Sequence, residues 1–364
     1  MENRKIRIGI THGDINGVGY ELILRTFEDE GMFDLCVPIV YGSPKVATYH
    51  RKALESTTNF TVINSPGDAR EGKLYMINCF GDSDLKVEFG QPTEESGRAA
   101  LVALQRALKD CQDGLIDALV TCPLDIVSVR STGEDFPGQT EYIEKQQGDN
   151  IFAIQVIAKD NLRIACATSH VPVQKIADTL NKDMLKERIL TFRDSLERDF
   201  GINGPRIAVL SLNPKGVDGT GSEENEVIEP AIFEAGNDGT VCFGPYPVDE
   251  FFGKGLYVQF DGILAMYHDQ AFAPFKSLVD EGGVSFTAGV QIVRTAPLLG
   301  TEYLIAGQGK VNLQSMRDAI YTAVDIFRNR TRDDEAYRHP LEKQYYEKKD
   351  DSYKLKLDQP DDGE

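Results

Sequence analysis

The chain of 364 residues is long enough for two domains, and 41% hydrophobic with 9% aromatic residues is an ordinary composition for a globular protein. Its formal net charge of −19 argues against nucleic acid or an anionic membrane surface as the main partner, since both attract clustered lysine and arginine. We therefore expect an anionic ligand to bind only where a local basic pocket forms.

The six cysteines show no C-x-x-C spacing, which argues against a zinc knuckle or a dithiol redox motif and favours free thiols in a reducing compartment. The first residues are charged where a signal peptide would be apolar, and no apolar run reaches membrane-spanning length. These features predict a cytoplasmic protein.

Short apolar runs rich in β-branched residues alternate with helical patterns along the chain. The predicted strands are Lys5–Thr11, Val37–Tyr41, Ala118–Thr121, Asn161–Thr168, Arg206–Leu212 and Gly262–Ala265. The predicted helices are Thr93–Asp113, Lys182–Phe200 and Val311–Arg330. This alternation predicts an α/β protein with a mostly parallel sheet and helices on both faces, in which ligands gather at the carboxyl ends of strands.

The last segment of the chain differs in composition. Residues 333–364 carry 11 acidic and 6 basic side chains and few apolar residues at any regular spacing. We predict a solvated or loosely docked charged tail over 333–364.

A glycine-rich loop, Gly13–Gly19, follows the first predicted strand and precedes a helical pattern. Such a loop can bring backbone N–H groups close to an anion or cofactor. It matches neither the dinucleotide-binding nor the P-loop pattern, so glycines that serve only a tight turn are an equal alternative.

A second candidate is the turn into a helix at Pro137–Glu141. Here Gln139 could offer an amide and Thr140 a hydroxyl to a substrate oxygen. Capping of the helix by Thr140 is the competing interpretation.

Two histidines, His170 and His268, come just after predicted buried strands, where a parallel sheet would turn them toward a cleft. A run between them offers Lys215, whose protonated amine has no lone pair for a metal. The alternative for each histidine is an ordinary hydrogen-bonded residue, the interpretation that we give to His12, His50 and His339.

Two cations follow in the same region. Lys276 comes eight residues after His268, and Arg294 ends an apolar run. Either could bind phosphate or carboxylate, and ordinary surface cations are the alternative.

Together these runs resemble the 4-hydroxythreonine-4-phosphate dehydrogenase (PdxA) family. The resemblance covers about residues 4–330 and rests on the glycine loop and five further runs. These runs are Phe136–Glu141, Thr168–Pro172, Leu212–Pro214, Leu264–Gln270 and Val293–Thr295.

The resemblance implies a two-domain fold similar to isocitrate and isopropylmalate dehydrogenases. One domain would span 1–130 with 290–332, the other 131–289, and the cleft between them would hold metal and substrate. It also implies a homodimer with active sites shared between subunits. The family oxidises the C3 hydroxyl of 4-hydroxy-L-threonine 4-phosphate with NAD or NADP in vitamin B6 biosynthesis. The product then loses CO2, and a divalent ion (Zn, Mg or Co) polarises the reacting oxygen.

Carried over by position, the resemblance assigns roles to residues of this chain. His170 and His268 match metal ligands, expected from opposite subunits, and Asp249 matches an acidic residue near the reacting centre. Thr140, Lys276 and Arg294 match substrate-binding positions. The cofactor segment corresponds to Leu299, Gly300, Thr301 and Gly307.

Several positions depart from the family pattern. Lys215 stands at the remaining metal histidine, Gln139 at a substrate-binding histidine and Ser285 at a substrate-binding asparagine. Asp125 or Ile126 falls where a lysine is usual. In the cofactor segment, Leu299 and Leu304 replace polar residues and Glu302 adds a negative charge.

Three hypotheses remain open. The chain is a working dehydrogenase in which Lys215, buried between the two histidines, donates a hydrogen bond to the substrate oxygen in place of the ion. Alternatively, it is a non-catalytic paralogue that binds a phosphorylated ligand as a sensor or partner subunit. The third hypothesis is a purely structural dimer.

Overall fold

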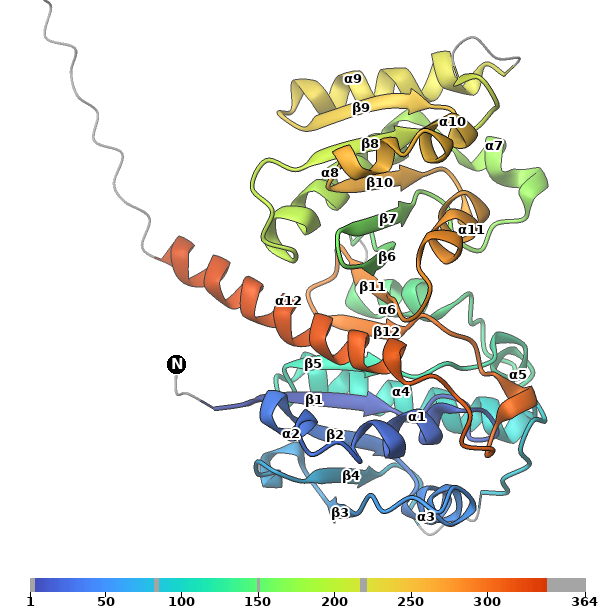
Figure 1. The fold of residues 1–364 in the computed structure, drawn as a ribbon, viewed down its shortest axis with the longest axis vertical. Helices are drawn as coiled ribbons and strands as arrows, with labels where there is room; N and C mark the ends of the chain where they lie inside the picture. Colours follow the sequence, from blue (N-terminus) through green and yellow to red (C-terminus); the bar gives the residue numbers. More distant parts are fainter. Residues whose placement is uncertain (1–3, 82–84, 149–150, 217–220, 339–364) are drawn as a thin grey trace, which may run out of the picture.

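The computed structural model describes residues 4–81, 85–148, 151–216 and 221–338 (Figure 1). Within these ranges twelve strands form one sheet. In spatial order they are β3 (Phe60–Ile63), β4 (Leu74–Asn78), β2 (Cys36–Gly42), β1 (Ile6–Thr11), β5 (Ala118–Thr121), β12 (Arg294–Pro297), β11 (Val284–Ala288), β6 (Ile154–Lys159), β7 (Leu162–Cys166), β10 (Gly262–Ala265), β8 (Arg206–Leu210) and β9 (Val241–Tyr246).

Pairing is parallel toward both ends of the sheet and antiparallel in the middle, between β12 and β11, β11 and β6, and β6 and β7. All six predicted strands are present, with boundaries within two residues of the prediction. The prediction of an α/β fold with a mostly parallel sheet is therefore confirmed. The sequence analysis missed β3, β4, β6, β9, β11 and β12.

The helices are α1 (Gly19–Thr26), α2 (Met32–Leu35), α3 (Pro44–Ala53), α4 (Glu94–Gln112), α5 (Ile126–Arg130), α6 (Gln139–Gln147), α7 (Ile176–Thr179), α8 (Lys182–Arg198), α9 (Glu229–Asn237), α10 (Val248–Gly253), α11 (His268–Leu278) and α12 (Gln314–Arg338). They cover both faces of the sheet, as strand β2 shows by its alternation. Ile39 and Tyr41 pack in the same cluster as Leu104 of α4, whereas Val40 packs in the cluster that contains α1 and α12.

Helix α4 shows how local sequence sets an element. Thr93 caps its first turn by accepting a hydrogen bond from Ser96 N at 3.1 Å, and Gly114 follows its end with a φ of +69°. Between these signals, Leu101, Leu104, Leu108 and Cys111 form the predicted buried stripe.

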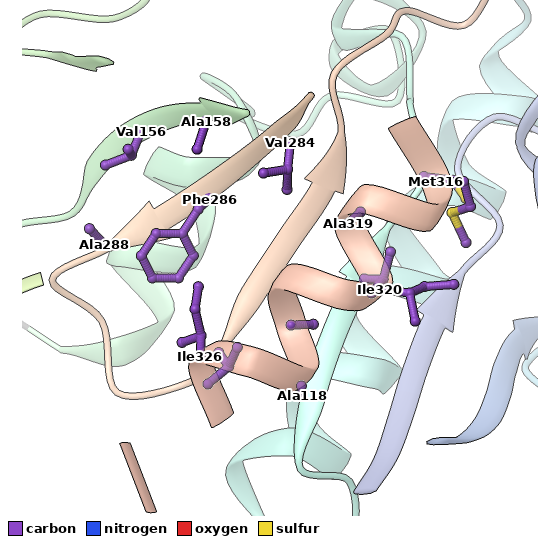
Figure 2. Close-up of a cluster of buried hydrophobic side chains, with 14 of the residues drawn as sticks. Ala118, Val156, Ala158, Val284, Phe286, Ala288, Met316, Ala319, Ile320 and Ile326 are labelled. Carbon is purple, nitrogen blue, oxygen red and sulfur yellow. The ribbon is translucent and has the colours of Figure 1, made fainter. Parts of the chain in front are cut away.

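Helix α12 lies across the central strands, where it packs on β12, β5, β11 and β1 (Figure 1). Met316 and Ile320 share one core with Val284 and Phe286 of β11 and Val156 of β6 (Figure 2). The strands of the predicted first domain form one end of the sheet and those of the second the other, with β12 and β11 hydrogen-bonded across the boundary. The division into two domains stays a prediction.

The expected tail begins too early. Helix α12 continues to Arg338, so the first six residues of the segment predicted as a tail (333–338) are helical. The rest, 339–364, lies outside the described residues. None of the described helices is long and apolar enough to cross a membrane.

A buried ion pair joins α12 to the C-cap residue of α8. Arg330 donates from Nε to Asp199 Oδ1 at 2.5 Å and from a terminal nitrogen to the carbonyl oxygens of Val290 and Gln291 at 3.1 and 2.7 Å. The exposed fractions of the two charged side chains are 9% and 3%. Removing one partner would leave the other charge buried without compensation.

We therefore expect Arg330→Met to lower the free energy of unfolding by about 3–5 kcal/mol, measured by urea denaturation followed by circular dichroism. Arg328→Met, an exposed position on the same helix, is the control and should change it by less than about 0.5 kcal/mol. Equal effects of the two substitutions would contradict a structural role for the Arg330 pair.

Candidate active site

A cavity of about 360 Å³ lies beside the carboxyl ends of β5, β7 and β10, on the face of β6 and β11 turned away from α12. It brings together residues from both predicted domains, at the middle of the sheet, as expected for strand ends that face one cleft. The predicted site residues that line it are Gln139, Thr140, His170, His268, Lys276, Ser285, Arg294, Leu299 and Gly300.

Arg294 forms the buried floor of this cavity and is only 3% exposed. Its guanidinium donates to Thr121 Oγ1 at 2.7 and 2.9 Å, to Thr287 Oγ1 at 3.1 Å and to Gln139 Oε1 at 2.9 Å. Burial lowers its pKa to about 10, so the group stays charged at neutral pH. All its hydrogen-bond partners among the described residues are neutral, and the carboxylate of Glu141 acts on its charge without a hydrogen bond, raising its pKa against the effect of burial.

The structure decides between the alternatives for the Pro137–Glu141 turn. Helix α6 begins at Gln139, and its N-cap is Gly138, without a side-chain cap. Capping by Thr140 is therefore wrong: its hydroxyl lies 3.3 Å from the hydroxyl of Thr287, at the cavity wall. Gln139 donates to Cys122 O at 3.4 Å in addition to its bond with Arg294.

His170 and His268 also line the cavity, and each Nδ1 is held by a carboxylate. His170 Nδ1 lies 3.1 Å from Glu141 Oε1, and His268 Nδ1 lies 2.9 Å from Asp269 Oδ1. The ring of His268 stacks on Phe272 at 3.9 Å between centroids. The carboxylate that bonds Nδ1 fixes the orientation of each ring. The other ring nitrogen, Nε2, is then available to a ligand or an ion.

A divalent ion would need more ligands than the two histidines supply. Among the described residues there is no group of three His, Cys, Asp or Glu side chains placed to hold a metal. His170 and His268 fit as two ligands with supporting carboxylates, and further ligands would have to come from substrate or a partner subunit. Both histidines line one cavity of a single chain, whereas the resemblance implies opposite subunits.

Lys215 and Asp249, predicted as catalytic, lie outside the lining of this cavity in the single chain. Lys215 is exposed in the turn after β8, with a φ of +67°, and Asp249 is exposed in the first turn of α10. The next residue in the turn, Gly216, approaches Pro245 and Pro247, so the two segments are neighbours. The expected burial of Lys215 between the histidines does not occur within one chain.

The glycine loop serves a tight turn rather than an anion cradle. Gly13 has a φ of +68°, and a Cβ there would lie 2.1 Å from Pro123 O, so only glycine fits. The loop's N–H groups have protein partners: Asn16 N donates to Asp14 Oδ1 at 2.7 Å and Val18 N to Thr301 O at 3.1 Å.

The predicted cofactor segment packs against the glycine loop. Tyr303 donates to Asp14 Oδ2 at 2.9 Å, and burial raises the pKa of the Asp14 carboxyl. Thr301 contacts the loop, Gly307 faces the Phe89 ring with a φ of +74°, and Leu304 is 93% exposed. Only Leu299 and Gly300 of the four predicted cofactor residues reach the cavity.

Sequence reasoning missed three polar residues at this site. Thr121, Thr287 and Gln155 touch Arg294 or line the cavity. For Gln155 and Thr287 the signal is a polar residue between buried apolar residues of a strand, as in Val284–Ala288. Thr121 instead ends the buried apolar run of β5.

A larger cavity of about 1280 Å³ lies on the other face of the central strands, beside α12. It is lined by many charged side chains, but several of these pair with each other, including Arg4 with Asp117 and Lys159 with Asp318. We place the active site in the smaller cavity because it holds Arg294 and both histidines.

His50 keeps its interpretation as an ordinary hydrogen-bonded residue, with Nε2 2.8 Å from Ile15 O. For His12 this interpretation is wrong: neither ring nitrogen has a hydrogen-bond partner among the described residues, and the ring stacks on Tyr20. His12 and His50 are fully buried, and burial lowers their pKa values to about 3 and about 4. His339 lies outside the described residues.

The His170–Glu141 contact should be visible as a shifted titration. The hydrogen bond to Glu141 raises the pKa of His170, against the lowering effect of burial, so the ring stays protonated to higher pH than an ordinary histidine. Burial raises the pKa of Glu141, but the hydrogen bond of His170, a backbone hydrogen bond and the charges of His170 and Arg294 together outweigh it, and the net pKa is lowered. The charged pair is lost as pH rises through the raised pKa of His170 or falls through the lowered pKa of Glu141.

We therefore expect Glu141→Gln to lower the pKa of His170, measured from the imidazole resonances by NMR. Glu144→Gln is the control, because Glu144 accepts a bond from Ala153 N instead. An unchanged His170 titration in the Glu141 variant would refute the contact.

Comparison with known proteins places this geometry in a family. The family model "Pyridoxal phosphate biosynthetic protein PdxA" matches residues 34–323. A curated 4-hydroxythreonine-4-phosphate dehydrogenase of Bacteroides thetaiotaomicron is 53% identical over 99% of this chain and 100% of its own length. A Cutibacterium acnes protein provisionally named as a D-threonate 4-phosphate dehydrogenase is 32% identical over 88% of this chain and 94% of its own length.

Solved structures agree. The crystal structure of a 4-hydroxythreonine-4-phosphate dehydrogenase from Burkholderia phymatum superimposes with a TM-score of 0.73 at 30% identity, covering 89% of this chain and 99% of that one. The resemblance inferred from the motifs is thus confirmed over nearly the whole fold. The chain belongs to the PdxA family of dehydrogenases that act in vitamin B6 biosynthesis.

Proposed function

We propose that this chain oxidises the C3 hydroxyl of 4-hydroxy-L-threonine 4-phosphate, or of a closely related phosphorylated hydroxy acid, with NAD or NADP and subsequent loss of CO2. The observation that carries the proposal is Arg294, a buried cation with neutral partners at the floor of the cavity that also holds both histidines. The 53% identical relative of that name supports it and favours a working enzyme over the non-catalytic alternative.

Different residues of the cavity would bind different groups of the substrate. Arg294 and Lys276 offer positive charge to the phosphate and carboxylate, and Thr140 adds a hydroxyl donor. Pro297, Leu298 and Leu299 supply an apolar wall that limits water near the reacting carbon. Together these side chains would hold one anionic substrate with its C3 hydroxyl toward the histidines.

Two absent groups would complete the chemistry. Bound at Leu299 and Gly300, the nicotinamide would accept hydride, and a divalent ion at His170 and His268 would polarise the C3 oxygen. Each histidine's Nε2 must be unprotonated to bind an ion, so the raised pKa of His170 makes proton and ion compete there.

We further propose a homodimer whose subunits share each active site. Lys215 and Asp249 are exposed in one chain and line no part of the cavity, so a catalytic role for either requires a neighbouring chain. In such a site the Lys215 ammonium would face substrate oxygen from the partner side.

The substrate proposal predicts NADH or NADPH production from 4-hydroxy-L-threonine 4-phosphate by the wild type. Arg294→Met should lower kcat/KM by roughly a hundredfold, because removing a buried hydrogen-bonded charge costs about 2–5 kcal/mol. Binding of the phosphorylated compound without any turnover would instead support the non-catalytic alternative.

The shared site predicts complementation between inactive variants. Dimers mixed from His170→Ala and Lys215→Met chains should recover part of the wild-type turnover, since one of their two sites is intact. Each variant refolded alone is the control. No recovery in mixtures that do form dimers would exclude a site built from both chains.

Metal content tests whether a side chain at position 215 can complete the ligand set of a divalent ion. Lys215→His should bind more divalent ion than the wild type, measured by elemental analysis in parallel with turnover, if this position completes the ligand set. Unchanged metal content would show that position 215 does not contribute a ligand.

A further inference from the structure

Gln155 is a polar residue in the wall of the candidate active-site cavity. It lies in β6, where Ile154, Val156 and Ala158 are buried in the core and Gln155 faces the opposite way, into the cavity. A glutamine among apolar strand residues requires partners for both ends of its amide.

Only one end of that amide is satisfied. Gln155 Nε2 donates to Ser285 Oγ at 3.1 Å, while Oε1 is buried and has no hydrogen-bond partner among the described residues. An unpaired buried acceptor is costly, so the site is complete only when a donor arrives. The cavity that both residues line is where that donor would come from.

The register of the sheet sets Gln155 at a fixed spacing from the anion site. Gln155 is paired with Thr287 of β11, and Thr287 accepts a hydrogen bond from Arg294 of β12. Neighbouring strands are about 4.8 Å apart, so Arg294 and Gln155 are roughly 10 Å apart across the sheet before their side chains converge. One short ligand can therefore present an anionic group to Arg294 and a donor to Gln155.

Resting on the proposed function, we propose that Gln155 Oε1 accepts a hydrogen bond from the C2 ammonium of the substrate and selects it over the matching 2-hydroxy acid. Both kinds of substrate carry the oxidisable hydroxyl and the phosphate. They differ at C2, where an ammonium offers charge-assisted donors and a hydroxyl only a neutral one.

Ser285, the hydrogen-bond partner of Gln155, takes part in the same proposed recognition. Ser285 is 6% exposed, and its hydroxyl accepts the hydrogen bond from the NH2 group of Gln155, which leaves the carbonyl oxygen of the amide for the ligand in this proposal. An asparagine at position 285 would bring an amide to the same place from β11. Gln155 and Ser285 together thus do the work that one amide on β11 could do.

The test compares Gln155→Met with the wild type on 4-hydroxy-L-threonine 4-phosphate and on D-threonate 4-phosphate. We expect KM for the amino substrate to rise about tenfold to a hundredfold with a much smaller change in kcat, and KM for the hydroxy substrate to rise less. Equal changes for the two substrates, or none, would overturn the inference.

Two further variants separate recognition from damage to the strand. Gln155→Glu keeps the shape and the acceptor, so it should retain the preference for the amino substrate, and a greater loss than with methionine would overturn the assignment of an acceptor. Ser285→Asn in the Gln155→Met background should recover part of the lost affinity, which a merely structural role would not do.

The matched control is Gln105→Met, which also removes an amide-to-hydroxyl hydrogen bond, from Gln105 Nε2 to Tyr142 at 3.0 Å, but outside the cavity lining. Its KM values should equal those of the wild type. If the wild type turns over neither substrate, the proposed function has failed, and calorimetric binding of the amino compound to wild type and Gln155→Met still tests Gln155. If the wild type is active and the Gln155 variant equals it, only the inference has failed.

Discussion

A single buried charge organises the active site. Arg294 is removed from water inside the sheet, where a guanidinium is costly unless its N–H groups are bonded and its charge is balanced. Hydroxyls from β5 and β11 and an amide from the start of α6 accept its hydrogen bonds, and all these partners among the described residues are neutral. The negative charge that acts on it is the carboxylate of Glu141 in α6, which raises its pKa against the effect of burial. The central strands and α6 must therefore keep their positions for the cation to stay ordered.

The central strands make this arrangement possible by giving their two faces different tasks. Val284, Phe286 and Ala288 of β11 belong to the core that α12 covers (Figure 2). Ser285 lines the cavity on the other face, and Thr287 accepts a hydrogen bond there from Arg294. Core and binding wall are therefore built from the same few residues in alternation. A shift of the register by one residue would exchange them, so the packing under α12 also fixes where the binding groups lie.

Much of this molecule could be predicted from the sequence. Strongly apolar strands such as β1 and β10, and the capped helix α4, carry their own local signals, and the run around His268 indicated the family. The missed strands are as long as the predicted ones, but most of them lack a continuous buried apolar run: β3 and β9 contain no buried residue, and β6 and β11 place polar residues among apolar ones because they form the cavity wall. Which face of such a strand is buried depends on its tertiary contacts. The position of Lys215 could not be predicted either, since the motif fixed its place in the chain and not its distance from the cavity.

The core under α12 has a mechanical consequence. The two halves of the molecule are joined by hydrogen bonds between β11 and β12 and by one continuous apolar cluster, rather than by a flexible linker. Opening one half away from the other would separate Met316 and Ile320 from Val284 and Phe286, at the cost of exposing that apolar surface. The packing under α12 therefore opposes any separation of the two halves, and with it any widening of the cavity whose wall is formed by β6 and β11.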